Sequence, residues 1–227
     1  MSKHLNMKIG LPVPIPSLQI GLLGTITPLR SFPQSRTELF DFALAGPATT
    51  FFISLIAYMY GLFLTVNASV DSIPFFPVWP ATIFKSSFLI GSMTSILASK
   101  IMLLPTGAPV PIHPLCTIAE VGLVSSALNM LPIGRTDGGR ASTSVFGDKS
   151  AQALSLATFF LMAIVCLTKR SVLLIFWGLF TLLFQRTPEI PSRDTVTEVN
   201  NGRFILYCVM LVLSILTLVP FPGGLAM

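Results

Sequence analysis

Few residues in this chain are suited to chemistry, and the most distinctive of them is the carboxylate of Asp137. It stands in the stretch NMLPIGRTDGGR, residues 129–140, directly after an apolar run and before two glycines. An ionisable group near membrane depth suggests a functional site, and neighbouring glycines let the backbone approach a partner closely. The ordinary alternative is a solvated side chain or a cap of the next helix. The local sequence leaves both interpretations open.

The other candidate groups are scattered. His113 and Cys116 stand three residues apart, but a connector histidine and a buried thiol explain them more simply than a metal pair. Glu120 lies in an apolar run, where pairing with a lysine or reaching an interface is the simpler expectation. The only other histidine is His4, and no spacing brings His4 or His113 to Asp137. These residues alone therefore predict no complete metal site.

Composition identifies a membrane protein. Of the 227 residues, 52% are hydrophobic and only 10% are charged, against about a quarter in a soluble domain. Runs without charge are long enough to cross a bilayer, since about 20 apolar residues suffice. The net charge is +5, but the basic residues are spread singly, so we expect the lipid bilayer and no nucleic acid as a partner. The charge-free runs are 42–70, 150–168, 171–185 and 204–227.

These runs predict an all-α polytopic membrane protein with about six membrane segments in one membrane-embedded domain, 1–227. Within it we distinguish an extended segment at 8–30, a core at 40–149 and C-terminal helices at 150–227. Apolar patterning and breakers place the helices at about 41–66, 82–104, 117–131, 150–168, 171–185 and 204–219.

The segment 8–30 cannot be helical at its start, because prolines occupy every second position at Pro12, Pro14 and Pro16. They remove the amide donors from one side of an extended chain. We expect a short re-entrant extended or β element there, and a surface loop in polyproline conformation is the alternative. The following residues 17–27 are suited to adding a strand by main-chain pairing.

The stretch 129–140 resembles the N-x-x-P-x-x-x-x-D-G-G-R element of the site-2 proteases, which are membrane-embedded zinc metalloproteases. Two further segments, LPVPIPSLQIGLLGTIT and FALAGPATTF, are similar to the plant and algal plastid branch, the ethylene-dependent gravitropism-deficient and yellow-green proteins. The resemblance covers essentially the whole chain from Lys3 onward. The residues that match the first element are Asn129, Pro132, Asp137, Gly138, Gly139 and Arg140.

The resemblance implies roles for several residues. Asp137 would be the third protein ligand to Zn²⁺, and Asn129 would orient the backbone of a membrane-protein substrate, although an interhelical hydrogen bond is an alternative for Asn129. Within residues 17–27 the candidate substrate contacts are Ser17, Gln19 and Gly21. The implied location is a plastid (chloroplast) membrane.

One departure limits these implications. The family's H-E-x-x-H motif, which supplies two histidine ligands and the general base, occurs nowhere in the 227 residues. In the family pattern it would lie shortly before Ser2, so we expect a chain truncated before that helix and inactive on its own. The alternative is a proteolytically inactive relative that binds membrane-protein clients as a regulator or chaperone. A small transporter would predict an inverted repeat, and the two halves show none.

Overall fold

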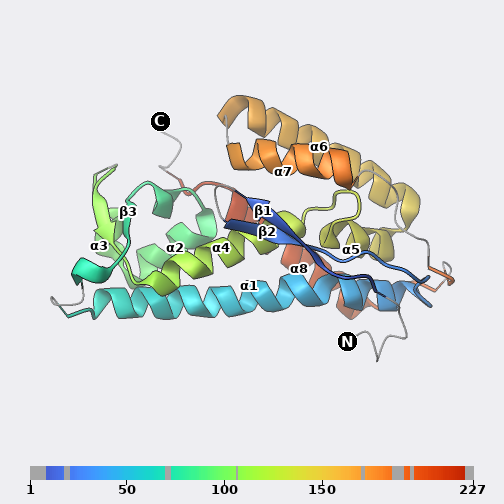
Figure 1. Cartoon of the computed structure of the whole chain (residues 1–227), viewed down its shortest axis with the longest axis horizontal. Coiled ribbons are helices and arrows are strands. Elements are labelled where there is room, and N and C mark those ends of the chain that lie inside the picture. The colour runs from blue at the N-terminus through green and yellow to red at the C-terminus, as the bar shows by residue number, and fades with distance from the viewer. Residues whose placement is uncertain are drawn as a thin grey trace. The chain divides into compact units, whose positions relative to one another are not determined.

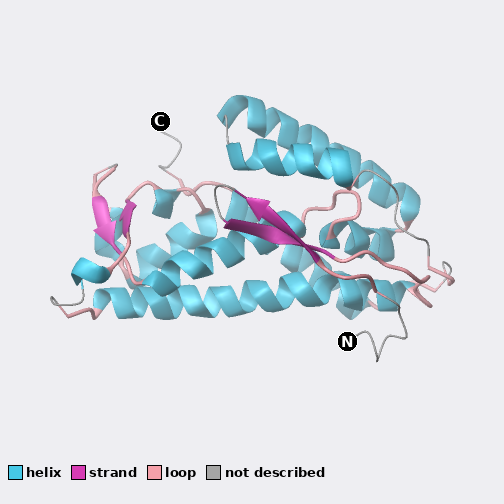
Figure 2. Cartoon of the chain, viewed as in Figure 1, coloured by secondary structure: helices cyan, strands magenta, loops and turns pink. Residues whose placement is uncertain are grey.

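Apolar helices make up most of the chain, as the composition predicts. The computed structural model describes residues 9–17, 21–69, 73–105, 107–169, 172–185, 192–194 and 197–222. Over these ranges the helices are accompanied by two short strand pairs (Figure 2). By their internal contacts the residues form two units: unit 1 comprises Met1–Ala48 and Asn129–Leu211, and unit 2 comprises Thr49–Leu128 and Val212–Met227.

Unit 1 begins with a β-hairpin, in which β1 (Val13–Ser17) pairs antiparallel with β2 (Gly21–Ile26). Ile15 lies opposite Gly24, and a bulge follows between Ile15 and Pro16. Because proline has no N–H, the ladder depends on the amides of Val13 and Ile15, and the prolines face the outer edge of β1. The expected extended element within 8–30 is therefore a hairpin. Gln19 lies outside the described residues.

Helix α1 (Arg36–Val66) starts five residues before the expected position at 41. Its start is capped in a way close to a capping box: the Ser35 hydroxyl accepts from the Glu38 amide at 3.2 Å, and the Glu38 carboxylate accepts from the amide of Gln34, the residue before Ser35, at 2.9 Å. The first part of α1 belongs to unit 1 and the rest, from Thr49, to unit 2.

The remaining helices of unit 1 follow residue 136. They are α5 (Asp137–Phe146), α6 (Asp148–Lys169), α7 (Val172–Phe184) and most of α8 (Asn201–Leu218). Helices α6 and α7 form an antiparallel pair that lies side by side (Figure 1). The boundaries of α6, α7 and α8 agree with the expected ones within three residues, whereas α5 was not expected. Its sequence DGGRASTSVF is rich in glycine, serine and threonine, which favour other conformations.

Unit 2 combines the second part of α1 with α4 (Pro114–Asn129) up to Leu128, α2 (Phe88–Leu97) and α3 (Ser99–Met102). The pair β3 (Val78–Pro80) and β4 (Pro109–Pro111) is antiparallel. Two short 3₁₀ turns are also present, η1 (Ile73–Phe75) and η2 (Ile83–Lys85). The single helix expected at 82–104 is wrong, because Ala98 adopts φ −140° and ψ 51° and separates α2 from α3.

Three of the described helices are long and apolar enough to cross a membrane: α1, α6 and α8. Helices α2 and α7 are apolar but shorter, with 10 and 13 residues, below the length that a bilayer crossing requires. The chain is thus a mostly helical membrane protein, as expected, but length and composition support three spans and not the six predicted.

Candidate functional site

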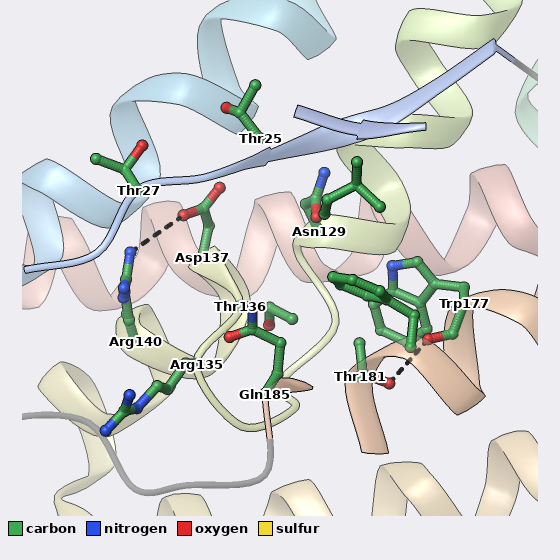
Figure 3. Close-up of a pocket in the computed structure, with 12 residues that line it drawn as sticks. Thr25, Thr27, Asn129, Arg135, Thr136, Asp137, Arg140, Trp177, Thr181 and Gln185 are labelled. Carbon is green, nitrogen blue, oxygen red and sulfur yellow. Dashed lines mark hydrogen bonds and ion pairs between the residues drawn. The ribbon is translucent and has the colours of Figure 1, made fainter. Parts of the chain in front are cut away.

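A pocket in unit 1 brings together segments that are far apart in the sequence (Figure 3). Its cavity volume is about 20 Å³, room for about one water molecule. Its walls come from the hairpin, the end of α4, the start of α5 and the inner face of α7. The lining residues are Ile15, Thr25, Thr27, Asn129, Arg135, Thr136, Asp137, Arg140, Trp177, Phe180, Thr181 and Gln185.

Asp137 reaches this pocket because the chain turns sharply after α4. Thr136 is the N-cap of α5, and its hydroxyl accepts from the Gly139 amide at 3.2 Å. The same hydroxyl lies 2.8 Å from the Ile133 carbonyl, to which it can donate. Asp137 is therefore the first residue of α5, not its cap, and Figure 3 shows its carboxylate pointing toward the hairpin.

The two glycines after Asp137 are required by close backbone packing. A Cβ on Gly138 would collide with the Met130 carbonyl, and a Cβ on Gly139 would collide with the Gly134 carbonyl. The first turn of α5 thus lies directly against the loop that carries it, which no larger residue would permit.

The loop is also held from its other side by α6 and α7. The Gly134 amide donates to the Ser155 hydroxyl at 3.1 Å, and the Arg135 amide donates to the Gln185 carbonyl at 3.2 Å. Gly134 has φ 51°, and a Cβ there would strike the Gln185 carbonyl. These contacts fix the backbone immediately before Asp137.

Asp137 has a buried cation beside it. The Arg140 guanidinium nitrogen lies 4.0 Å from the Asp137 carboxylate, and the exposed fractions of the two side chains are 4% and 29%. The guanidinium also lies over the Phe42 ring, 5.8 Å from its centroid. The carboxylate is thus the more accessible member of the pair.

Asn129, the last residue of α4, faces the hairpin. Its amide group touches the backbone of Gly24 so closely that a Cβ there would overlap the amide nitrogen. Gly24 also has φ 147°, a conformation that favours glycine. The side chain of Asn129 therefore lies next to an extended backbone, and on the same pocket as Asp137 (Figure 3).

The described residues of this chain do not by themselves make a zinc site. A catalytic zinc needs about three protein ligands, and among the described residues no three histidine, cysteine or acidic side chains are gathered closely enough. In the pocket Asp137 is accompanied by two arginines, Arg135 and Arg140. The site offers one carboxylate ligand and would need imidazoles from elsewhere.

The other candidate groups have structural roles or lie elsewhere. In unit 2 the His113 ring packs edge-on against Phe76, and its Nδ1 accepts from the Leu115 amide at 3.2 Å. Cys116 is buried where α4 approaches Gly61 of α1. His4 lies outside the described part of the chain.

The structure brings Asn129 and Asp137 together but places Ser17 and Gly21 at the turn end of the hairpin, where they pair with each other. Among the hairpin residues the pocket is lined instead by Ile15, Thr25 and Thr27. The contribution of α7 was not foreseen. Its signal is present in the sequence, since a tryptophan and a threonine stand four apart in an otherwise aliphatic and phenylalanine-rich helix. The α7 residues of the pocket wall are Trp177, Phe180 and Thr181, and Gln185 follows directly after the helix.

Comparison with known proteins gives a consistent group of relatives. The chain is 35% identical over 223 residues to the probable zinc metalloprotease EGY1, chloroplastic, of Arabidopsis thaliana. It is 30% identical to the probable zinc metalloprotease EGY2 and 32% identical to the probable zinc metallopeptidase EGY3 of the same plant. These matches cover 97%, 98% and 92% of the chain but 39%, 38% and 37% of the relatives. The chain thus spans about two fifths of their length. No protein-family profile and no solved structure matches it.

Proposed function

Because these 227 residues belong to the family of the chloroplast proteins EGY1, EGY2 and EGY3, we propose that they form the client-binding part of an intramembrane zinc metalloprotease. In this proposal Asp137 supplies one ligand to the metal and Asn129 orients an extended peptide beside it. The family relationship confirms the resemblance and the plastid location expected from it. The observation that carries the functional proposal is that Asp137 and Asn129 line one pocket, directly beside the hairpin.

The size of the pocket favours an extended client. The cavity has room for about one water molecule, whereas an α-helix with its side chains is about 10 Å wide. A transmembrane helix would have to unwind before a peptide bond reached Asp137. Unwinding exposes backbone amides and carbonyls, which need new partners in an apolar environment.

The hairpin offers such partners on one edge only. The outer edge of β1 lacks amide donors at Pro14 and Pro16, whereas β2 contains no proline. Within the described ranges no third strand pairs with β2. Since Val13 and Ile15 bond toward β2, alternation along β2 turns the Thr25 amide outward. We place the client strand along this edge, with Ser17 and Gly21 at the turn end as proposed contacts and with Gln19 kept as a contact from the sequence prediction.

The remaining metal ligands and the general base are assigned to an H-E-x-x-H segment outside these 227 residues. We also propose that six of the helices enter the bilayer: α1, α6 and α8 as spans, and α2, α4 and α7 as shorter segments that are buried in it.

A second function has an observation in its favour. Asp137 lies beside the buried cation Arg140, and an ion pair of this kind needs no metal. In that alternative the chain binds unwound membrane proteins without cutting them, as a regulator or chaperone.

The test compares this chain with a longer protein in which an H-E-x-x-H segment precedes it. Both are placed in liposomes with a reporter that carries one cleavable transmembrane segment. We expect cleavage by the longer protein only, abolished by Asp137→Ala and retained in Asp148→Ala, whose carboxylate opens α6. Cleavage that persists in Asp137→Ala would reject the assignment of Asp137. If the longer protein binds the reporter but does not cleave it, the result would favour the binding function.

A further inference from the structure

Helix α7 has two distinct faces. Phe180 and Thr181 stand three and four residues after Trp177, so the three share one side of the helix, and all three line the pocket. The side chains on the opposite face are exposed and entirely apolar, as suits contact with lipid. These exposed residues are Ile175, Phe176, Leu179, Leu182 and Leu183. The helix thus stands between the pocket and the apolar surroundings.

The inner face of α7 is apolar although it contains a threonine. The Thr181 hydroxyl lies 3.0 Å from the Trp177 carbonyl and can donate to it, so its hydrogen is directed back into the helix (Figure 3). The rings of Trp177 and Phe180 are thus the apolar groups that α7 contributes to the pocket wall, which also includes the polar side chains of Asn129 and Asp137.

The side chain of Trp177 and the part of α7 that carries it are tightly packed, so the rings of Trp177 and Phe180 cannot easily move away from the pocket. Trp177 is only 1% exposed. Behind it Gly178 packs against Met162 of α6, where a Cβ would come within 2.6 Å of the methionine methyl carbon. Helix α7 is also held at its end through the Gln185 carbonyl, which accepts from the Arg135 amide. The rings are therefore a firmly held part of the pocket wall that Asp137 also lines.

We propose that Trp177 and Phe180 form a subsite that selects the side chain of the client next to Asp137, admitting glycine, alanine or serine and excluding larger residues. This inference rests on the proposed function, because it assumes an extended client along β2. It adds the specificity of the site, which would choose small residues from an otherwise bulky transmembrane sequence.

Binding of defined peptides to the purified chain in detergent tests this. The probes are fluorescein-labelled peptides of ten valines flanked by lysines, in which one central valine is replaced by alanine or by leucine. A uniform valine background prevents the peptide from presenting another small residue by sliding. We expect the alanine peptide to bind at least about 10-fold more tightly than the leucine peptide, as a tight apolar pocket discriminates.

Enlarging the pocket should remove this preference. Trp177→Ala and, as a milder change, Phe180→Ala are each expected to bring the two affinities within about threefold. Phe176→Ala is the matched control on the exposed face of the same helix and should keep the preference. If the preference survives both pocket variants, or vanishes equally in Phe176→Ala, the proposed subsite is wrong, but client binding along β2 is not contradicted. If neither peptide binds the wild-type chain, client binding along β2 is itself wrong.

Discussion

At the scale of single residues, the contact between Gly24 and Asn129 combines a positive φ with a close approach of a side chain. Gly24→Ala introduces backbone strain at φ 147° and a clash with the Asn129 amide, with an expected loss of about 1–3 kcal/mol in the free energy of unfolding. Gly21→Ala is the matched control, since its φ is 77° but nothing lies within 4 Å of its Cβ. It should cost only about 1 kcal/mol.

A double-mutant cycle separates the two causes. Asn129→Ala in the Gly24→Ala background should recover the part of the loss that comes from the clash, whereas in the Gly21→Ala background it should recover nothing. Denaturant unfolding in detergent, followed by circular dichroism, measures the wild type, the three single variants (Gly24→Ala, Gly21→Ala and Asn129→Ala) and the two double variants. Equal losses for the two glycine variants would show that the Asn129 side chain does not lie against β2.

The sequence predicted the identities of Asn129 and Asp137 but not how they are positioned. Asp137 was open to interpretation as a helix cap, whereas the cap is Thr136. The structure explains why positions 138 and 139 require glycine: their backbone lies directly against carbonyl groups, which the sequence does not reveal. Arg140 matched the family pattern, yet its burial beside Asp137 depends on α1, which supplies the Phe42 ring from nearly a hundred residues away.

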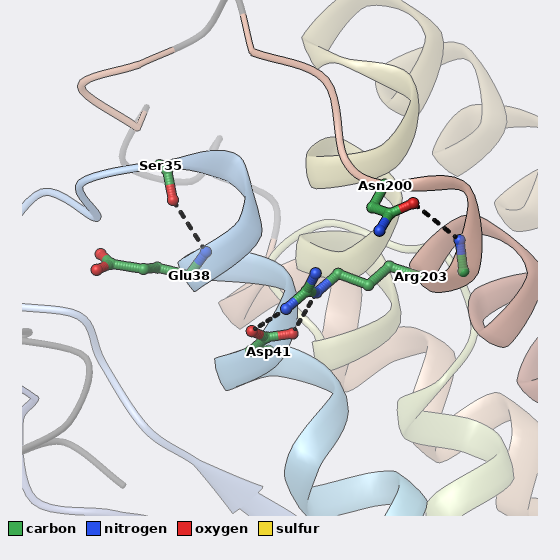
Figure 4. A network of polar contacts seen from close by, with 6 residues as sticks. Ser35, Glu38, Asp41, Asn200 and Arg203 are labelled. Atoms are coloured by element: carbon green, nitrogen blue, oxygen red, sulfur yellow. Dashed lines mark hydrogen bonds and ion pairs between the residues drawn. The ribbon is translucent and has the colours of Figure 1, made fainter.

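At the scale of elements, the starts of α1 and α8 are joined by one ion pair (Figure 4). The Arg203 guanidinium binds the Asp41 carboxylate through two hydrogen bonds, of 2.8 Å and 2.9 Å. Both side chains are about one third exposed, so the pair should contribute no more than about 1 kcal/mol. Arg203→Lys cannot form the same two-pronged contact and should lose about 0.5–1 kcal/mol.

Salt dependence distinguishes this pair from general packing. The stability difference between wild type and Arg203→Lys should shrink as the salt concentration rises, because partly exposed charges are screened. Glu198→Gln, at an exposed position in the same unit, serves as the control and should change stability little. A difference that stays constant in salt would assign the loss to packing.

The outward edge of β2 gives a second prediction at this scale. Thr25→Pro removes the amide that we place on that edge and should weaken binding of the valine-based peptides by about 10-fold, since one main-chain hydrogen bond in an apolar site is lost. Thr25→Val keeps the amide and nearly the same size, and should bind normally. Equal binding by both variants would exclude strand addition at β2.

The sequence predicted some of the helices better than others. Long charge-free runs located α6, α7 and α8, because a long apolar run favours a membrane helix. The start of α1 was encoded by Ser35 and Glu38, a capping signal that the apolar pattern alone did not include. No glycine or proline marks the break at Ala98, so the division between α2 and α3 had no local signal.

At the scale of the whole molecule, α1, α4 and α8 each contribute residues to both units, while the pocket is built within unit 1 alone. Its construction from the hairpin, α5 and α7 requires contacts across more than 150 residues of sequence, which no local pattern specifies. Family membership followed from short motifs, but the participation of α7 did not.

The central claim is that Asp137 is a ligand in a metal site completed by histidines from outside these residues. The most direct test is the zinc content of the purified longer protein and of this chain alone, measured by mass spectrometry after dialysis. We predict about one zinc per molecule for the longer protein. We predict almost none for its Asp137→Asn variant or for the chain alone. A full complement of zinc in the Asp137→Asn variant would contradict the account.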